Sequence, residues 1–346
     1  MTLRKPEPGY EFVRGSGLLS ECQQLLSAAN LQPPFMIISD SNVAPLHAEQ
    51  LGAALDAGLI QFPAGEENKN LATLERVYHR LAEANMERSG TIIALGGGVV
   101  GDLAGLAAAT FMRGLRWVNI PTSTLAMVDA SIGGKVAIDL PQGKNLVGAF
   151  HQPSLVIADV DTLKTLPAVE YRSGLVEAIK AAIIGDELLF HWFEQGGPLP
   201  SIRWLQRAIS VKVEIVEQDP FERNIRAQLN LGHTAGHGLE AASGYRLRHG
   251  EAIALGLLIE ARIAEELAIA EPGLTDRIKQ VLARWQLPTT FNQVPVAEIR
   301  QAMNADKKKA NDDLHFALPS RVGQVELVAD IPEEVIRQAI EQRREG

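Results

Sequence analysis

The first half of the chain alternates short apolar runs with amphipathic helical patterns. Each run is rich in apolar and β-branched residues and is bounded by turn residues, which is typical of strands buried on both faces of a parallel sheet. Apolar residues at three-four spacing between the runs indicate helices. This alternation predicts a parallel α/β sheet covered by helices. The predicted strands are 35–40, 91–95 and 117–121, and the predicted helices are 47–57, 71–85 and 99–110.

From Ala168 onward the helical pattern dominates, and strand-like runs almost vanish. A chain of 346 residues is long enough for two domains that each bury a core. We therefore predict a boundary near Pro167, between an α/β domain at 1–165 and an all-α domain at 166–346. The predicted helices of the second domain are 170–184, 204–217, 233–242, 252–268, 275–285 and 333–341, and its one strand-like run is 323–328.

Composition excludes several classes of function. The formal charge is −9, with 42 acidic and 33 basic side chains, so a nucleic acid or an anionic membrane is not the expected partner. The single cysteine, Cys22, excludes an internal disulfide, and the first residues lack the apolar core of a secretory signal. No apolar run approaches the roughly 20 residues that span a bilayer. We expect a soluble cytoplasmic protein.

A glycine-rich turn follows the strand predicted at 91–95. The sequence Gly96-Gly-Gly-Val-Val-Gly101-Asp102 matches the pattern GxGxxG and leads into an Ala-rich helix. Glycines let backbone N–H groups approach a pyrophosphate, and the helix N-terminus adds a partial positive charge. A Rossmann-like dinucleotide site is expected, although no acidic residue near position 120 could hold a ribose. Asp40 is the better ribose candidate, and a tight turn needed only for packing is the alternative.

A polar segment follows, in which charged residues stand among glycines. Asp129-Ala-Ser-Ile-Gly-Gly-Lys135 is followed by Gly143-Lys-Asn145. Exposed backbone donors and lysine charges are the usual means of holding a phosphate or a polyhydroxylated anion. A solvated surface loop is the alternative interpretation.

Three of the eight histidines lie close together late in the chain, at His233, His237 and His249. Imidazole is the commonest protein ligand of zinc, cobalt and iron, so the cluster suggests a metal site, with surface histidines as the alternative. Glu177 and Lys180 share one face of a predicted helix among apolar residues, where Glu177 is a candidate third ligand. An exposed ion pair is the alternative there.

Basic and amide side chains precede the histidines. Arg226 and Asn230 are four residues apart, and with Lys212 they are candidates for one anion clamp. Arginine binds a carboxylate through two parallel hydrogen bonds, whereas lysine and asparagine suit phosphate or hydroxyl oxygens.

The order of these motifs resembles the 3-dehydroquinate synthase family of sugar-phosphate cyclases. The resemblance spans most of the chain, and the motifs are far more specific as a set than the glycine pattern alone. It implies an NAD-binding α/β domain, a helical domain, one divalent metal ion, zinc or cobalt, and a homodimer. The motifs are 96–102, 129–135, 143–145, Leu163-Lys-Thr-Leu-Pro167, Glu177-Ala-Ile-Lys180, 230–237 and His249-Gly-Glu251.

Residue roles follow from the resemblance, position by position. It implies that Glu177, His233 and His249 bind the metal ion and that His237 faces the substrate. The implied substrate contacts are Lys212 and Arg226 at the carboxylate, Lys135, Asn145, Asn230, His237 and Lys307 or Lys308 at the phosphate and hydroxyls, Asp129 and Lys180 at the ring hydroxyls, and Arg113 from the neighbouring subunit. The implied NAD contacts are Asp40, Glu66, Lys69, Gly96, Gly97, Gly98, Val99, Gly101, Asp102, Thr122, Ser123, Asp129, Lys135, Lys144, Asn145, Thr165, Leu166 and Glu170.

The resemblance also implies a reaction. The substrate would be 3-deoxy-D-arabino-heptulosonate 7-phosphate, which is transiently oxidised by NAD+, loses phosphate, is reduced again and closes by an internal aldol step to 3-dehydroquinate. His237 and Lys180 are the candidates for proton transfer, with Asp129 and Lys135 as orienting groups. Val136 and Ala235 depart from the family's common threonine and phenylalanine.

Three other functions remain as alternatives. A related sugar-phosphate cyclase would act on another phosphorylated sugar, and a polyol dehydrogenase of the same architecture would release NADH. A neutral polyol does not need Lys212 and Arg226, which argues against the dehydrogenase. A catalytically silent binding protein would require lost ligands, and none is lost here.

Overall fold

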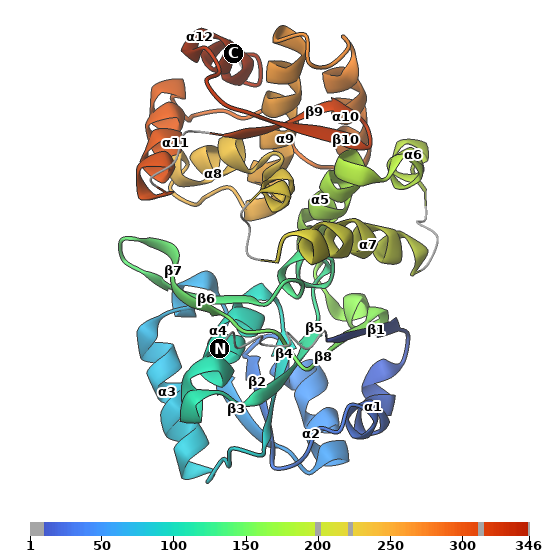
Figure 1. Ribbon diagram of the computed structural model, residues 1–346, viewed down its shortest axis with the longest axis vertical. Helices are drawn as coiled ribbons and strands as arrows, with labels where there is room; N and C mark the ends of the chain where they lie inside the picture. Colours follow the sequence, from blue (N-terminus) through green and yellow to red (C-terminus); the bar gives the residue numbers. More distant parts are fainter. Residues whose placement is uncertain (1–9, 198–201, 221–223, 311–314, 345–346) are drawn as a thin grey trace, which may run out of the picture. The chain divides into compact units, whose positions relative to one another are not determined.

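The computed structural model describes residues 10–197, 202–220, 224–310 and 315–344, with the backbone alone for 305–310. The chain divides into two compact units, Met1–Pro167 and Ala168–Gly346 (Figure 1). The boundary predicted between 165 and 166 lies two residues before this division. The first unit is α/β and the second is mainly helical, so the predicted fold class is confirmed.

A six-stranded parallel sheet forms the centre of the first unit, in the order β1-β8-β5-β4-β2-β3. The three predicted strands are present as β2, β4 and β5. Phe35–Asp40 is the second strand of the chain, not the first, because the short edge strand β1 precedes it and lacks a continuous apolar run. The strands are β1 Glu11–Gly15, β2 Phe35–Asp40, β3 Gly58–Phe62, β4 Thr91–Gly96, β5 Arg116–Pro121 and β8 Leu155–Asp159.

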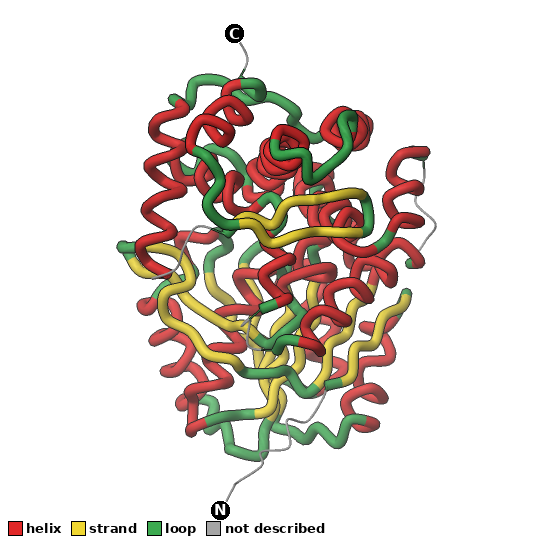
Figure 2. The backbone as a smooth tube through the Cα atoms, turned by 45° about the horizontal axis from the view of Figure 1, so that its top comes forward, coloured by secondary structure: helices red, strands yellow, loops and turns green. Residues whose placement is uncertain are grey.

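Helices cover both faces of this sheet (Figures 1 and 2). Alternate residues of a strand point to opposite faces, so Ile38 and Ile92 pack with α3 and α4, whereas Ile37 and Ile93 pack with α1 and α2. Burial on both sides explains the continuous apolar runs of the central strands. The helices are α1 Cys22–Ala28, α2 Glu49–Leu55, α3 Leu71–Glu83 and α4 Gly98–Thr110.

The strand order reverses between β2 and β4. The chain leaves β2 through α2 and reaches β3 on one side, and it leaves β4 through α4 and reaches β5 on the other. In open α/β sheets, ligands bind beyond the carboxyl ends of the strands at such a switch point. Asp40 ends β2 and Gly96 ends β4, so the topology places both residues at the expected position.

The predicted polar segment folds in part as an antiparallel hairpin instead of a loop. The π-helical turn η5, Ala126–Ala130, contains Asp129. The strands β6, Lys135–Leu140, and β7, Gly143–Phe150, pair beyond it. The remaining short turns of this unit are η1 Leu18–Glu21, η2 Ala44–Ala48, η3 Glu66–Asn68, η4 Phe111–Arg113 and η6 Val160–Thr165.

The second unit packs around α9, which is buried along most of its length. This helix begins at His249, three residues before the predicted start, so His249 is its first residue. Strands β9 and β10 form one antiparallel hairpin, which adds a small sheet to this helical unit (Figure 2). None of the helices within the described residues is long and apolar enough to cross a membrane. The elements are α5 Ala168–Gly185, α6 Glu187–Gln195, α7 Arg203–Gln218, η7 Ile225–Asn230, α8 His233–Ala242, α9 His249–Glu266, α10 Leu274–Arg284, α11 Val296–Ala310, β9 Phe316–Arg321, β10 Gln324–Val328 and α12 Glu333–Glu341.

Candidate functional site

The glycine turn between β4 and α4 has the geometry of a phosphate-binding turn. Gly97 is the N-cap of α4 and offers no capping side chain. Packing explains Gly96, because a Cβ atom there would lie 2.5 Å from Val100. It does not explain Gly97 or Gly98, whose Cβ atoms would have their nearest contacts at 3.6 Å. The turn therefore leaves backbone room that a pyrophosphate fits, which favours the dinucleotide interpretation.

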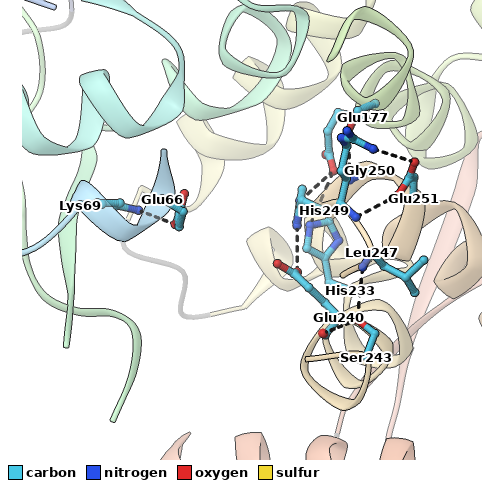
Figure 3. Close-up of polar contacts among 12 residues, drawn as sticks. Glu66, Lys69, Glu177, His233, Glu240, Ser243, Leu247, His249, Gly250 and Glu251 are labelled. Atoms are coloured by element: carbon cyan, nitrogen blue, oxygen red, sulfur yellow. Dashed lines mark hydrogen bonds and ion pairs between the residues drawn. The ribbon is translucent and has the colours of Figure 1, made fainter. Parts of the chain in front are cut away.

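A buried lysine connects the glycine-turn helix with the hairpin. Lys69 Nζ lies 2.5 Å from Asp102 Oδ2, 2.5 Å from Asn145 Oδ1 and 3.8 Å from Glu66 Oε1 (Figure 3 shows the last pair). Burial lowers the pKa of Lys69, but the Asp102 and Glu66 carboxylates outweigh it and raise the pKa overall. Burial raises the pKa of Asp102 to about 6, against the opposing effect of Lys69. Four predicted cofactor residues thus form one polar cluster.

Other predicted cofactor residues lie at the ends of strands. Asp40 Oδ1 accepts hydrogen bonds from the backbone N–H groups of Asn42 and Val43, which holds the carboxylate at the end of β2. The Thr122 N–H donates to Gly96 O, which joins the end of β5 to the glycine turn. Ser123 Oγ accepts from the Ala126 N–H.

The remaining predicted residues of the NAD set are more scattered. Thr165 Oγ1 lies 2.9 Å from His47 Nε2, and the Leu166 N–H donates to Leu163 O. Lys135 and Lys144 are exposed on the hairpin. Glu170 belongs to the second unit, where its carboxylate lies 3.5 Å from Arg248 Nε.

Three side chains of the second unit converge on one point. Glu177 Oε1 lies 3.7 Å from His233 Nε2 and 3.6 Å from His249 Nε2, and the donor atoms come from α5, α8 and α9 (Figure 3). Nitrogen and oxygen ligands about 2.0–2.1 Å from a tetrahedral zinc ion stand about 3.4 Å apart. Neither Glu177 oxygen accepts a hydrogen bond of normal geometry, although the carboxylate is buried. The donor set therefore fits one divalent ion.

Polar partners orient both imidazoles. His233 Nδ1 lies 3.1 Å from Leu231 O, and His249 Nδ1 lies 3.4 Å from Glu240 Oε2. Metal-binding histidines usually engage a carbonyl or carboxylate through the nitrogen that does not bind the ion. Each Nε2 atom is thereby left to face Glu177.

The ion pair beside this centre is buried, not exposed. Lys180 Nζ lies 2.5 Å from Glu177 Oε2, and both side chains are at most 4% exposed. Burial opposes ionisation of Glu177, but Lys180 and the imidazoles hold its pKa well below the ordinary value. Burial and then Lys180 lower the pKa of His233. Burial also lowers that of His249, but Glu177 and Glu240 outweigh it and raise the pKa to about 9.

His237 is exposed and lies beside the centre. Its ring centroid is 5.1 Å from that of His233 and 5.8 Å from that of His249. His237, Glu240 and His249 form a second set of donor atoms close enough to hold an ion. The Glu177 set is the better site because its carboxylate is buried and Glu240 already faces the Nδ1 atom of His249.

The four-residue spacing of Arg226 and Asn230 does not put them on one helical face, so it does not itself support the expected clamp. These residues lie in the 3-10 helix η7, where positions three apart share a face and positions four apart do not. Arg226 is buried and donates from Nη1 to Pro220 O at 2.6 Å, whereas Asn230 is exposed. Lys212 is buried in α7. Arg113 is exposed with a φ of 68° in the turn η4, and the side chains of Lys307 and Lys308 lie outside the described residues.

Three polar residues of these clusters were not predicted. Glu240 follows His237 by one helical turn, and this spacing was the available signal. Glu260 is a single carboxylate in the otherwise apolar run 252–261. Asp139 Oδ1 accepts from the Asn145 N–H at 2.7 Å, a contact that no local pattern indicates.

Comparison with known proteins places this chain among related enzymes. Models of the 3-dehydroquinate synthase N-terminal and C-terminal domains match residues 59–173 and 174–309. A 3-dehydroquinate synthase of Symbiobacterium thermophilum is 41% identical and covers 98% of this chain and 99% of that protein. One of Xylella fastidiosa is 40% identical and covers 98% and 97%.

Solved structures show the same fold. The 2-epi-5-epi-valiolone synthase of Streptomyces hygroscopicus, with NAD+ and Zn2+ bound, superposes with a TM-score of 0.90 at 27% identity over 99% of this chain and 98% of that chain. A 2-deoxy-scyllo-inosose synthase, complexed with carbaglucose-6-phosphate, NAD+ and Co2+, has a TM-score of 0.88 at 25% identity over 97% and 98%. With both domain models matched and relatives about 40% identical over nearly the whole length, the chain belongs to the 3-dehydroquinate synthase family.

Proposed function

We propose that this chain is a 3-dehydroquinate synthase, converting 3-deoxy-D-arabino-heptulosonate 7-phosphate to 3-dehydroquinate and phosphate. The carrying observation is the buried Glu177 carboxylate, whose Oε1 atom lies 3.7 Å from His233 Nε2 and 3.6 Å from His249 Nε2, both on oriented imidazoles. The chain that carries this centre is 41% identical to a protein named 3-dehydroquinate synthase.

Glu177, His233 and His249 are proposed to hold one Zn2+ or Co2+ ion. Three protein ligands leave a position open, as a catalytic site requires. When bound, the ion supplies Lewis-acid activation of a hydroxyl. The structural neighbours that carry Zn2+ or Co2+ together with NAD+ support this choice.

The glycine turn, Asp40 and the Lys69 cluster are proposed to hold NAD+, along with the other predicted NAD contacts. When bound, NAD+ would accept a hydride from the substrate and return it within the same turnover. The turn contributes backbone N–H groups and a helix N-terminus for the pyrophosphate. Asp40 is the proposed ribose partner, because its carboxylate is held at the end of β2 at the switch point.

His237 and Lys180 are proposed to handle protons at the substrate hydroxyl. His237 is exposed, which allows its imidazole to exchange a proton with solvent. The Lys180 ammonium is held beside Glu177 at 2.5 Å, so its charge is set beside the metal-binding carboxylate. Asp129 and Lys135 are the proposed orienting groups. Oxidation of the hydroxyl makes the neighbouring C–H acidic, which allows phosphate to leave by elimination. After the ketone is reduced again, an enol of the substrate closes the ring by an internal aldol step.

Local basic groups are needed because the net charge of −9 repels an anionic substrate. Lys212 and Arg226 are proposed to bind its carboxylate, and their burial would strengthen such a contact. Lys135, Asn145, Asn230 and Lys307 are proposed at its phosphate and hydroxyls.

One assay tests the function. The protein is incubated with the heptulosonate phosphate, NAD+ and Zn2+, and phosphate release is measured beside absorbance at the NADH wavelength. Phosphate release without net NADH is expected, because the hydride returns to the product. Net NADH would indicate a dehydrogenase, and no phosphate release would contradict the proposal. Glucose 6-phosphate in a parallel reaction tests for a cyclase of other sugar phosphates.

The metal ligands are tested separately. Glu177→Ala is expected to lose bound metal, measured by elemental analysis after dialysis. Unchanged metal content would overturn the ligand assignment whatever the phosphate assay shows.

We further propose a cytoplasmic homodimer in which Arg113 reaches the phosphate bound by the neighbouring subunit. Arg113 is exposed in a turn with left-handed backbone, where Met112 also has a positive φ of 50°. Such a backbone costs free energy in a residue other than glycine.

A further inference from the structure

Glu260 connects the two helices that carry the histidine ligands. It lies in α9, the helix that begins at His249, and its side chain is completely buried. Its carboxylate accepts from the Gly232 N–H at 2.5 Å and the Ala235 N–H at 3.1 Å, and the Thr234 N–H also bonds to it. These donors belong to the start of α8, whose first residue is His233.

The start of α8 needs a partner from elsewhere in the chain. The first N–H groups of a helix have no acceptor within the helix, and an N-cap side chain usually supplies one. The N-cap here is Gly232, with a φ of 78° and no side chain. A Cβ atom there would lie 2.9 Å from Leu257. Glu260 replaces the missing cap and places a carboxyl group at the positive end of the helix dipole.

This contact fixes the backbone on both sides of His233. The preceding Leu231 carbonyl lies 3.1 Å from His233 Nδ1, so the orientation of the ring depends on the backbone that Glu260 holds. The two helices also touch directly, because a Cβ atom at Gly256 would lie 1.9 Å from Gly232 O. A displaced helix start would therefore move the imidazole away from Glu177, and metal sites tolerate such errors poorly.

We propose that Glu260 is a positioning residue of the metal centre, which caps α8 from α9 and thereby sets where His233 meets Glu177. The inference rests on the ligand assignment proposed above. Glu260 lies outside every predicted site. A positioning role means that changing Glu260 lowers the affinity for the metal ion beyond any effect on the stability of the fold.

The same helix offers a matched control. Glu265 Oε1 accepts from the Gly273 N–H and the Thr275 N–H, both at 2.9 Å. Gly273 is the N-cap of α10, with a φ of 104° and no capping side chain. Glu265 thus also caps a helix whose N-cap is glycine, although a single oxygen accepts both hydrogen bonds and its Oε2 accepts from Arg262 Nη1 at 3.3 Å. The helix α10 carries none of the proposed site residues.

The test compares Glu260→Gln with Glu265→Gln in the full-length protein. The two oxygens of Glu260 accept from different N–H groups, and an amide accepts only at its oxygen, so Glu260→Gln leaves a backbone N–H without its acceptor. In Glu265→Gln one oxygen can still accept both N–H groups, but the carboxylate partner of Arg262 is lost. Zn2+ affinity is measured by competition with a chromophoric chelator, Co2+ coordination by visible absorption, and the stability of the metal-free protein by thermal unfolding. We expect both variants to lower the unfolding midpoint, and Glu260→Gln alone to weaken Zn2+ binding by about tenfold or more and to alter the Co2+ spectrum.

Wild-type Zn2+ affinity in Glu260→Gln would overturn the inference, as would equal weakening in Glu265→Gln. Glu260→Asp keeps the carboxyl group and both of its oxygens but shortens their reach, so a smaller loss of Zn2+ affinity is expected. This second variant keeps the test decisive if Glu260→Gln does not fold. Glu177→Ala is measured alongside. Metal retained in that variant would overturn the ligand assignment and this inference with it, whereas metal lost there but wild-type affinity in Glu260→Gln would overturn this inference alone.

Discussion

At the scale of single residues, Glu177 and Lys180 depend on each other. Both are buried, and their charged atoms lie 2.5 Å apart. Glu177→Gln leaves the Lys180 ammonium without its carboxylate partner, so we expect the metal-free protein to lose about 3 kcal/mol of unfolding free energy. The double variant Glu177→Gln/Lys180→Met removes both charges and should recover most of this loss. Chemical denaturation measures both values.

Metal binding should separate from stability in that pair of variants. Neither variant offers the Glu177 carboxylate, so neither is expected to retain Zn2+. This holds even for the double variant, whose unfolding free energy should be close to that of the wild type. Zn2+ bound by the double variant at wild-type affinity would contradict the ligand assignment.

Asp102 gives a prediction about pH. Its pKa is raised from 3.8 to about 6, chiefly by burial, so the folded protein holds this proton more tightly than the unfolded chain does. The stabilisation of the folded protein by protonated Asp102 is complete below the ordinary pKa of 3.8. It is lost as the pH rises to the pKa of Asp102 in the folded protein. Asp102→Asn cannot titrate. The unfolding free energy of the wild type relative to this variant should fall by as much as about 3 kcal/mol between about pH 4 and about pH 6. A difference in unfolding free energy between the two proteins that stays constant over this pH range would contradict the raised pKa of Asp102.

Sequence reasoning at this scale identified residue types and spacing, but not environments. The three-residue spacing placed Glu177 and Lys180 on one face, yet an exposed pair fitted that spacing equally well. Burial decides between the two, and it depends on α8 and α9, which lie far along the chain.

At the scale of elements, the close approach of α8 and α9 is the critical packing contact. A Cβ atom at Gly256 would lie 1.9 Å from Gly232 O, which is backbone and cannot move aside without shifting the helix. Gly256→Ala is expected to cost about 3 kcal/mol or more in unfolding free energy. It should also weaken Zn2+ binding, because α8 carries His233.

Gly52→Ala is the matched control for this substitution. Gly52 lies within α2, and the nearest atom to its Cβ would be Ala57 O at 3.4 Å. Alanine there is expected to leave stability unchanged or raise it by up to about 1 kcal/mol, with Zn2+ affinity unchanged. A Gly256→Ala protein as stable as this control would show that the two helices do not need their close contact.

Element prediction succeeded where periodicity was long and failed where local geometry decided. The central strands and most helices of the second unit were predicted, because burial imposes a repeat over many residues. The edge strand β3 alternates between exposed and buried residues too briefly to be recognised. The 3-10 turn of η7 was also missed, and in it the four-residue spacing of Arg226 and Asn230 does not give a shared face.

At the scale of the whole molecule, the proposed dimer predicts complementation between defective subunits. Arg113→Ala should lose activity because the neighbouring site lacks its arginine, and Glu177→Ala because its own site lacks a ligand. A mixed dimer contains one site with all its residues, so unfolding and refolding the two variants together should restore phosphate release. Light scattering measures the assembly, and each variant refolded alone is the control. A monomer, or mixtures as inactive as the separate variants, would contradict the proposal.

The sequence by itself determined the central strands of the sheet, most of the helices, the glycine turn and the residue types of both clusters, because these depend on local spacing. Only the tertiary structure decided which groups meet. Glu177 comes from α5, His233 from α8 and His249 from α9, and their convergence follows from how three helices pack. The tertiary structure also assigned Glu240 and Glu260 to the neighbourhood of the histidines. A carboxylate acquires such a role from the groups buried around it, and local sequence does not encode those groups.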